Sequence, residues 1–567
     1  MSQFEIKNSR ERDREIIAKS KQRKNANSYM ISLNNKYILI NTRELLLSLL
    51  DKLVCDISLK VIRNDDTIFG IAISIQNYNY YIDVSVLDEN LKKSFSQKLK
   101  KCRLIGYRIA SDVNSLYTLF NDEFLFYWDV YLAAKVLNEN LHSYLLQDLC
   151  KIYNLNSDEE LYKILTIDIN TRQHKNNGRA FGEYSRQIKK LYEYQSKYLL
   201  SEKMKEQYSL FMNIEMPSAA VLSSMERLGI TFDESKRKSL YNKYLKLLSA
   251  TEKSNKAYLS YEKMLNTYLM FNKYVRNDGK IHTIFDQYGS VTGRIYSTKP
   301  PLQQMPSKGE TKEIRNIFRA KDNYILLSAD FSSQEPRIIT HLSNDKKLID
   351  IYKNKQDLYA IIASKVYNRE YKDCLEYYDD GKVNDEGKSY RTKGKIIWLS
   401  LSYGATTNGL AKELDCSVNE AQKIIDTIYS EYPGLFEYRK NIIDFAKKNK
   451  YVTTLWGRKR RFPQFKNIKD LSQKDLAKLE RQCVNSVIQG SGADMIKKAM
   501  ITIYNDDILQ KLGLELLLPI HDELLCQCPI ENVDDCSKRV KLLMESCAND
   551  KMDIPLKVDI NVFTNWE

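Results

Sequence analysis

Apolar and polar positions alternate in a way that predicts a mixed α/β organisation for the first third of the chain. Residues 67–75 and 79–86 are short β-rich runs that we expect to pair as strands, and residues 115–149 are expected to be mainly helical. Strands that alternate with helices favour an α/β or α+β domain. From residue 205 to 280 the apolar side chains recur at helical spacing, with Lys and Arg on the other faces, which predicts a helical region.

A strand, a turn and a helix are predicted between residues 324 and 343. The apolar run 324–327 is too short for an ordinary helix, so it predicts a buried strand that ends near Asp330. Glu335 and Arg337 then begin an amphipathic helix. The strand end leaves the Asp330 carboxylate where it can meet a metal ion without being buried alone. The alternative is an Asp that only caps the next helix.

Residues 389–404 predict a helix that carries charged and apolar side chains on one face. Arg391, Lys395, Leu399 and Tyr403 recur every four residues. Two cations one turn apart, followed by an apolar side chain and Tyr-Gly, suit a triphosphate that lies below a base and a sugar. The alternative is a solvated basic face, which fits less well with the apolar run that follows the two cations.

Residues 478–504 predict a long helix that Gly490 and Gly492 interrupt. A polar stripe runs along it through Arg481, Asn485 and Gln489. Such a stripe can contact the groove edges of a duplex or form a structural hydrogen-bond network, and the pattern leaves both readings open.

A charged β-hairpin is predicted at residues 514–530, which are apolar on both sides of His521, Asp522 and Glu523. Buried charges must be paired or bind a metal ion. An ordinary polar turn would more often use Asn-Gly or Asp-Gly. The hairpin tip is therefore a second candidate for metal binding.

Two loops and the N-terminus add basic side chains. Loop 291–306 offers Arg294 beside small residues, and residues 458–461 are expected to form a surface loop that contacts phosphate. Residues 1–30 are rich in charge and predict either a mobile tail or an arm that binds nucleic acid.

The composition narrows the class of partner and compartment. A chain of 567 residues predicts three or four folding units, and a formal charge of +15 favours a polyanion, with nucleic acid ahead of an anionic membrane surface. No apolar run reaches 18 residues and no signal peptide is evident, so no membrane association is expected. Ten scattered cysteines without a CxxC pair argue against zinc and favour a reducing, cytoplasmic compartment.

These segments, in this order, resemble the family A DNA polymerases, the group typified by bacterial DNA polymerase I. Residues 330–337 resemble motif A of that family, residues 391–404 resemble motif B, and residues 521–523 resemble motif C. The resemblance extends from about residue 212 to the C-terminus and also takes in 292–294, 432–434 and 485–500. The SQEPR form of motif A is more similar to phage-type members.

The resemblance implies an α+β multidomain fold: a right-hand polymerase with an antiparallel palm sheet and helical fingers and thumb, preceded by an RNase H-like α/β domain of the exonuclease type. The implied divisions are a charged arm (1–30), a 3′–5′ exonuclease-like domain (31–203), a shortened thumb (204–288), the first part of the palm (289–355), the fingers (356–464) and the second part of the palm (465–567).

The resemblance also implies the roles of the site residues. Asp330 and Asp522, with the backbone carbonyl of Phe331, would hold two Mg²⁺ ions, with Mn²⁺ as a possible substitute. Lys395 would be catalytic, donating a proton to pyrophosphate. The implied dNTP-binding residues are Gln334, Glu335, Arg391, Lys395, Leu399, Tyr403 and Tyr359, among which Glu335 would exclude a 2′-hydroxyl. The implied DNA-binding residues are Arg294, Arg481, Asn485, Gln489, His521 and Glu523.

Several positions depart from the family pattern. Leu399 replaces the usual aromatic residue, Tyr359 stands where a phosphate-contacting His is common, and Pro519 stands where a Gln is frequent. Because the thumb is several tens of residues short, the grip on DNA is expected to involve a processivity factor.

The exonuclease-like domain is expected to be inactive. Asp56 aligns with the first metal ligand and Asp112 with the second motif, but Ser58 replaces the Glu of the D-x-E pair. Tyr192 is present in the third motif, whereas Ser196 stands where the metal-binding Asp belongs. Two remaining carboxylates of four cannot hold both metal ions, so proofreading should be absent.

The function that follows is template-directed DNA synthesis on a primer-template from dNTPs, in replication of a phage or mobile element. The first alternative is a single-subunit RNA polymerase, against which Glu335 argues. The second is a catalytically silent scaffold that binds nucleic acid; retention of Asp330, Asp522, Arg391 and Lys395 argues against it.

Overall fold

The computed structural model describes residues 36–53, 55–64, 67–155, 174 and 177–567, so the expected arm at residues 1–30 lies outside the described residues. The chain divides into two compact units. Unit 1 comprises Met1–Val291 and Tyr296–Met305, and unit 2 comprises Thr292–Ile295 and Pro306–Glu567.

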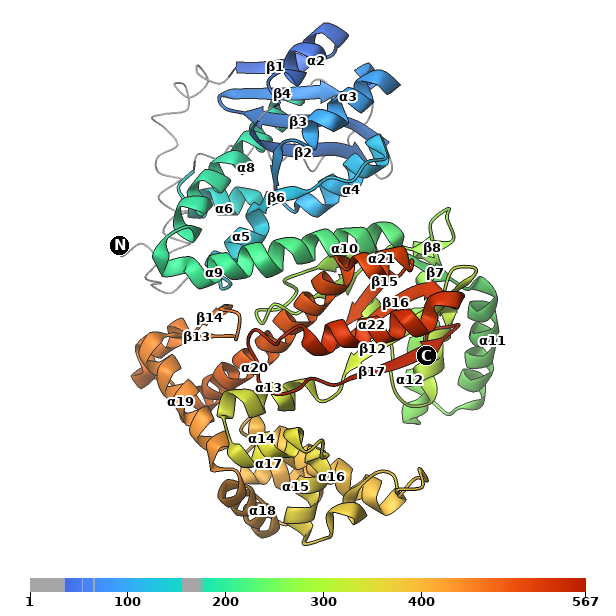
Figure 1. Ribbon diagram of the computed structural model, residues 1–567, viewed down its shortest axis with the longest axis vertical. Helices are drawn as coiled ribbons and strands as arrows, with labels where there is room; N and C mark the ends of the chain where they lie inside the picture. The colour runs from blue at the N-terminus through green and yellow to red at the C-terminus, as the bar shows by residue number, and fades with distance from the viewer. Residues whose placement is uncertain (1–35, 54, 65–66, 156–173, 175–176) are drawn as a thin grey trace. The chain divides into compact units, whose positions relative to one another are not determined.

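A six-stranded sheet forms the first part of unit 1 (Figure 1). Its order is β1 (Lys36–Ile40), β4 (Tyr78–Asp83), β3 (Thr67–Ile75), β2 (Asp56–Asn64), β5 (Arg103–Gly106) and β6 (Phe126–Asp129). Strand β3 runs antiparallel to both of its neighbours, and the other pairs are parallel. The predicted pairing of the two runs after residue 67 is confirmed, since β3 and β4 form a hairpin.

Helices cover this sheet. They are α2 (Arg43–Leu50), α3 (Glu89–Leu99), α4 (Ile109–Phe120), α5 (Val130–Leu137), α6 (Leu146–Ile152) and α8 (Gly178–Leu199). Helix α8 packs on β2, β3 and β4. The prediction that residues 115–149 are mainly helical is confirmed in part, because α4, α5 and α6 contribute to this range but β6 and connecting segments separate them. Asp129 ends β6 and caps α5, where its carboxylate accepts hydrogen bonds from the Tyr131 and Leu132 amides.

The helical prediction for residues 205–280 is confirmed. This part of unit 1 holds α9 (Lys205–Leu210), α10 (Met216–Leu228), α11 (Glu234–Ala250) and α12 (Lys256–Asn266). Short strands accompany them: β7 (Ile230–Phe232) pairs with β8 (Lys280–Ile281), and β9 (Ile284–Asp286) pairs with β10 (Tyr296–Thr298).

Unit 2 is built on an antiparallel sheet of four strands in the order β15 (Glu515–Ile520), β16 (Glu523–Pro529), β12 (Tyr324–Phe331) and β17 (Val558–Phe563). Helices α20 (Gln473–Tyr504) and α22 (Val533–Ser546) pack on the sheet and on each other (Figure 1). The predicted strand before Asp330 and the predicted hairpin at 514–530 are both confirmed, and they are neighbours in this sheet.

A helical region lies between β12 and α20 in the chain. It contains α13 (Gln334–Ser343), α14 (Lys346–Lys353), α15 (Leu358–Tyr367), α16 (Asp385–Ser402), α17 (Thr407–Leu414), α18 (Val418–Glu431) and α19 (Pro433–Asn449). Unit 2 also contains the strands β11 (Phe318–Arg319), β13 (Tyr451–Thr453) and β14 (Lys459–Arg461) and the helix α21 (Asp507–Lys511).

Two expectations about the last third of the chain are wrong. Helix α20 continues through Gly490 and Gly492 without a break. A Cβ at Gly490 would lie 2.6 Å from the Thr454 side chain, so this glycine permits close packing rather than ending the helix. Residues 458–461 do not form a surface loop, because Arg458 is only 3% exposed and the next three residues form the partly exposed strand β14.

Candidate functional site

The sheet of unit 2 places a row of acidic side chains at one end. In the antiparallel register, Asp330 on β12 lies directly between Glu523 on β16 and Asp559 on β17. The Phe331 amide donates to the Asp522 carbonyl at 3.2 Å, which joins the end of β12 to the hairpin turn. Like charges directly opposite one another destabilise a sheet. The row therefore calls for a counter-charge.

Asp330 has the most strained electrostatic environment in this row. Its Oδ1 is buried and accepts no hydrogen bond from any described residue. Burial, followed by the neighbouring carboxylates, raises the pKa of Asp330 from 3.8 to about 7. These neighbours are Asp522, Glu523 and Asp559. A cation bound at this position would satisfy the oxygen and relieve the repulsion.

The oxygen ligands at this end of the sheet fit Mg²⁺ only if water and substrate complete its coordination. Within the described ranges, no three His, Cys, Asp or Glu side chains converge closely enough to hold a metal ion by themselves. Magnesium commonly takes one or two carboxylates and completes its octahedron with water and substrate phosphates. Asp330 and Asp522, with the Phe331 carbonyl, match that requirement.

The backbone takes left-handed conformations on both sides of the acidic row. Ser333 (φ 55°) is the N-cap residue of α13 and His521 (φ 57°) occupies the hairpin turn. Asp330 does not cap the helix, so the capping alternative is wrong. Burial, and then the charge of Arg294, lowers the pKa of His521. Such conformations are uncommon outside glycine and concentrate at functional sites.

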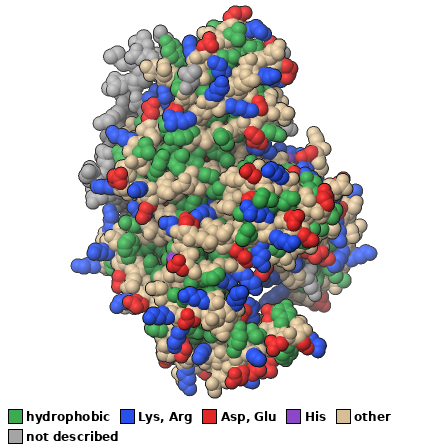
Figure 2. Space-filling model, viewed as in Figure 1, with side chains coloured by type: hydrophobic (Ala, Val, Ile, Leu, Met, Phe, Trp, Pro, Cys, Tyr) green, Lys and Arg blue, Asp and Glu red, His purple; other side chains and the backbone are tan. Residues whose placement is uncertain are grey.

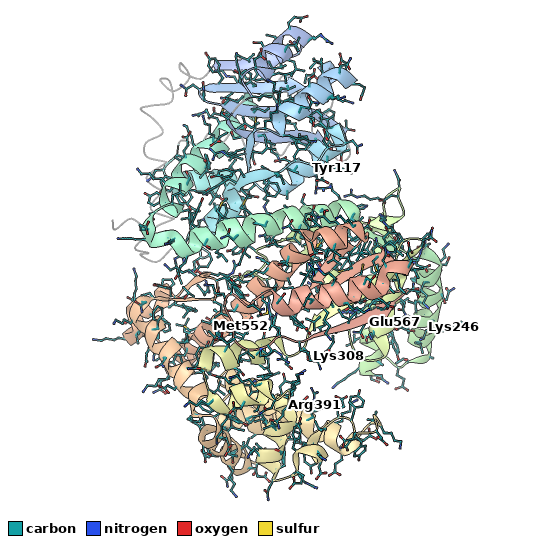
Figure 3. The ribbon with its side chains drawn as sticks, viewed as in Figure 1. Tyr117, Lys246, Lys308, Arg391, Met552 and Glu567 are labelled. Atoms are coloured by element: carbon teal, nitrogen blue, oxygen red, sulfur yellow. The ribbon has the colours of Figure 1, made fainter. Side chains whose placement is uncertain are left out.

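Two cations of α16 meet one aromatic ring. The Arg391 guanidinium and the Lys395 ammonium lie 5.4 and 5.8 Å from the centre of the buried Tyr359 ring. Arg391, which Figure 3 labels, is also ion-paired to Asp357 at 2.8 Å and to Glu376 at 3.5 Å. The structure therefore brings the three predicted triphosphate residues together, with Arg391 held by carboxylates.

Both carboxylate oxygens of Glu335 are held. Arg294 donates to Oε1 at 2.9 Å, and the Tyr403 hydroxyl donates to Oε2. Burial, and then the charge of Glu335, raises the pKa of Tyr403. Gln334 differs from its neighbour, because it is buried and its amide donates to the Gly492 carbonyl on α20 at 3.4 Å.

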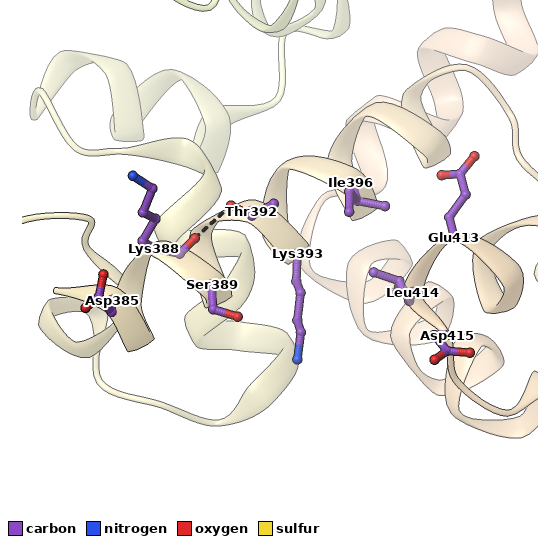
Figure 4. Close-up of a pocket in the computed structure, with 9 residues that line it drawn as sticks. All are labelled: Asp385, Lys388, Ser389, Thr392, Lys393, Ile396, Glu413, Leu414 and Asp415. Carbon is purple, nitrogen blue, oxygen red and sulfur yellow. Dashed lines mark hydrogen bonds between the residues drawn. The ribbon is translucent and has the colours of Figure 1, made fainter. Parts of the chain in front are cut away.

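Two cavities lie along α16. One of about 430 Å³ is lined by Leu399, Tyr403 and Arg481, so the structure brings these three predicted residues together. The second, of about 470 Å³, includes Lys388 and Lys393 of α16 and faces α17 (Figure 4).

The polar stripe on α20 is half-buried. Arg481, Asn485 and Gln489 are all partly exposed, and the buried Oδ1 of Asn485 accepts no hydrogen bond within the described part of the chain. This favours neither reading of the stripe over the other.

Of the five predicted exonuclease positions, Asp56 and Tyr192 are in contact, but Asp112 does not join them. Asp56 accepts two hydrogen bonds from Arg103, at 2.5 and 2.8 Å, and one from the Tyr192 hydroxyl at 3.2 Å. Asp112 instead pairs with Lys60 at 2.8 Å and accepts from the Val61 amide. Since Asp56 begins β2, the contact with Val61 lies about 16 Å further along the strand.

The two serines of this set make structural hydrogen bonds. The Ser58 hydroxyl donates to the Ser185 carbonyl at 2.7 Å, and the Ser196 hydroxyl donates to the Glu193 carbonyl within its own helix. The sequence reasoning missed Lys60, for which the available signal was a cation between the apolar residues Leu59 and Val61 of the same strand. It also missed Asp559, which no local pattern distinguishes.

The charged surface is mixed rather than one-sided on the face in view. Figure 2 shows Lys and Arg interspersed with Asp and Glu. Across the described residues, no helix combines the length and hydropathy that a membrane crossing requires.

The antiparallel sheet of unit 2 and the helices that pack on it are consistent with the fold of a right-hand polymerase. A solved structure described as "POL domain of Pol1 from M. smegmatis complex with DNA primer-template and dNTP" is similar with a TM-score of 0.79 and 21% identity. The similarity covers 93% of this chain and 99% of that one. At this identity the likeness shows the fold alone.

Curated relatives and a family profile identify the family. DNA polymerase I of Caldicellulosiruptor bescii is 34% identical over 312 residues, which is 54% of this chain and 35% of the relative. DNA polymerase I of Lactococcus lactis subsp. lactis is 34% identical over 293 residues, or 52% and 32%. The matched part is thus about a third of each relative. The profile of DNA polymerase family A matches residues 183–567, and the chain belongs to that family.

Proposed function

We propose that this protein is a template-directed DNA polymerase that adds deoxynucleotides to a primer 3′-hydroxyl and releases pyrophosphate. One observation carries the proposal: Asp330 lies in a row of carboxylates with a buried oxygen that no described residue satisfies. A protein has little reason to keep this repulsion unless a cation relieves it. Membership of the family supplies the reaction in which such a cation is used.

Asp330, Asp522 and the Phe331 carbonyl would hold two Mg²⁺ ions. When bound, these ions lower the pKa of the primer hydroxyl and stabilise the charge that develops on the leaving pyrophosphate. The chain's own residues prepare the site for them. The Phe331–Asp522 backbone hydrogen bond keeps the two ligand-bearing segments together, and Ser328 donates to Glu523 so that this carboxylate supports the row.

Arg391 and Lys395 bind the triphosphate beside Tyr359. Arg391 then exchanges Asp357 and Glu376 for phosphate oxygens. Lys395 is exposed and close to the same ring, and it donates a proton to pyrophosphate. In this way the positive charge needed at the leaving group comes from one helix face.

Glu335 selects the sugar. Because both of its oxygens are held, the carboxylate is fixed in place and its body excludes a 2′-hydroxyl. Tyr403 stacks near the templating base beside Leu399, and Gln334 is assigned to the dNTP site. Contacts to primer-template DNA are assigned to Arg294, Arg481, Asn485, Gln489, His521 and Glu523.

The domain limits are part of this proposal: an exonuclease-like domain to residue 203, a short thumb to 288, and a palm in two parts (289–355 and 465–567) around fingers at 356–464. A role in replicating a phage or mobile element rests on the SQEPR form of residues 333–337. The short thumb supports a processivity factor as partner. Ten cysteines without a disulfide among the described residues support a reducing compartment.

The test is primer extension with dNTPs and Mg²⁺. Wild type should extend the primer with dNTPs and far less with NTPs, and Asp522→Ala should lower the rate by about 10²- to 10³-fold or more, because a metal ligand is lost. The matched control is Asp550→Ala, an exposed carboxylate paired with Lys498, which should extend normally. Extension by Asp522→Ala at the wild-type rate contradicts the site, and preference for NTPs would favour the RNA polymerase.

The absence of proofreading is supported by the in-chain cations. Arg103 neutralises Asp56 and Lys60 neutralises Asp112. Asp56 begins β2, whereas Asp112 lies on α4 and contacts β2 at Lys60 and Val61. A primer with a mismatched 3′ end should therefore remain intact when it is incubated with the protein and Mg²⁺ without dNTPs. Gel electrophoresis of the primer measures this. Degradation that Asp56→Ala removes would overturn this part of the proposal.

A further inference from the structure

A buried ion pair lies behind the loop that carries Arg294. The side chains of Arg458 and Asp494 are 3% and 0% exposed, and Arg458 Nε donates to Asp494 Oδ1 at 2.9 Å. The Thr454 hydroxyl donates to Asp494 Oδ2 at 2.7 Å and accepts from the Arg458 amide at 3.0 Å. Asp494 thus holds the guanidinium of Arg458, and Thr454 holds its backbone amide.

Loop 292–294 packs closely against the guanidinium of Arg458. A Cβ at Gly293 would lie 2.5 Å from Arg458 Cζ, and Gly293 has a φ of +81°. A Cβ at Gly490 would lie 2.6 Å from the Thr454 methyl group and 3.5 Å from the Thr292 carbonyl oxygen. Glycine at both positions allows loop, pair and α20 to approach this closely.

The next residue of the loop is Arg294, which donates to Glu335. Glu335 in turn accepts from Tyr403. A continuous series of contacts therefore runs from Asp494 through Arg458 and Gly293 to the carboxylate proposed to select the sugar. All of these residues belong to unit 2.

We propose that Arg458 and Asp494 are positioning residues that fix loop 292–294, so that Arg294 holds Glu335 in the orientation that excludes a 2′-hydroxyl. The inference rests on the proposed function, because nucleotide insertion is the reaction that it affects. A buried ion pair is by itself weak evidence for stability, since hydrophobic replacements are often at least as stable. The contact of the Arg458–Asp494 pair with loop 292–294 gives the pair a role in the site that is separate from stabilising the fold.

The test is a double-mutant cycle. For each variant, kcat/KM is measured with a dNTP and with the matching rNTP, and the ratio of the two values is compared. Arg458→Lys loses the two-pronged contact to Asp494. Gly293→Ala keeps both charged side chains but places a Cβ against the Arg458 guanidinium, which displaces the loop. Each should lower the ratio by about tenfold, the factor expected for one charged hydrogen bond. In an Arg294→Ala background, each should change the ratio by no more than about twofold, because the contact through which it acts is gone.

Arg539→Lys is the matched control, because Arg539 forms a similar paired contact with Asp506 at 2.7 Å on other elements of unit 2. It should leave the ratio unchanged. Multiplicative effects with Arg294→Ala, or a lower melting temperature with an unchanged ratio, would overturn the positioning role. If Arg458→Lys does not fold, Gly293→Ala decides the question.

Failure of the proposed function is distinguishable from failure of this inference. If the wild-type protein extends no primer, the same set of variants is compared by a different measurement. This is the affinity for a labelled primer-template, measured by fluorescence anisotropy. Equal, non-additive losses for Arg294→Ala and Arg458→Lys then support the positioning role, and additive losses oppose it.

Discussion

The properties of the Asp330 carboxylate are set by the side chains around it. The carboxylate lies between two others in the sheet register, and its pKa is raised to about 7 by burial and by these neighbours. Such a shift is a statement about stability as well as about metal binding.

Asp330→Asn should stabilise the metal-free protein in a pH-dependent way. The folded state holds the Asp330 proton up to about pH 7, whereas the unfolded chain releases it near 3.8. Wild-type stability should therefore fall as the pH rises between these values. The gain from the substitution should be near zero at pH 4 and roughly 2 kcal/mol above pH 7, allowing for solvent screening of a partly buried group.

Urea denaturation in EDTA at several pH values measures this difference. Adding Mg²⁺ at pH 8 should stabilise wild type and leave Asp330→Asn almost unaffected. A constant gain at all pH values would show that charge repulsion is not its source.

The sequence predicted the members of this site that have a local pattern, but not all of them. Asp330 and Asp522 follow or interrupt apolar strands, so each could be named as a candidate, although Asp330 alone also fitted a helix cap. Asp559 reaches the site only through the pairing of β17 with β12, two segments far apart in the chain. Register between distant strands depends on tertiary packing, which no local pattern reports.

At the scale of elements, the sequence predicted most of the length of α20 but wrongly predicted a break within it. The glycines that suggested a break lie inside an unbroken helix, where each meets a neighbouring element. In the same way, Arg458 resembled a surface phosphate ligand but is buried against Asp494. A basic cluster and a pair of glycines have several structural explanations, and only packing distinguishes them.

The two glycines should respond differently to alanine. At Gly490 the new Cβ would meet the Thr454 methyl group at 2.6 Å, and the Thr454 hydroxyl is held by Asp494. At Gly492 it would meet Oε1 at the flexible end of Gln334 at 2.7 Å. Gly490→Ala should therefore destabilise the protein by about 1–3 kcal/mol through overpacking.

Gly492→Ala should be neutral or stabilising by up to about 1 kcal/mol, because alanine favours helix and the glutamine can move. Thermal denaturation of both variants beside wild type tests the contrast. Equal losses of stability would mean that Thr454 is not the immobile neighbour described above.

At the scale of the whole molecule, the formal charge of +15 is large while the visible face carries both signs. Binding of a primer-template should accordingly depend on salt. For four or five phosphate contacts, affinity should fall roughly 10²- to 10³-fold between 50 and 200 mM salt. Fluorescence anisotropy at four salt concentrations gives the slope, and affinity that is independent of salt would exclude a phosphate-dominated interface.

The path of the chain between its two units has a practical consequence for protein engineering. The chain enters unit 2 at Thr292–Ile295, returns to unit 1 for Tyr296–Met305, and then continues in unit 2 from Pro306. A truncated protein that begins at residue 306 would lose Arg294 and would uncover the buried Arg458. Anyone who seeks a minimal version of this protein should retain residues 292–305.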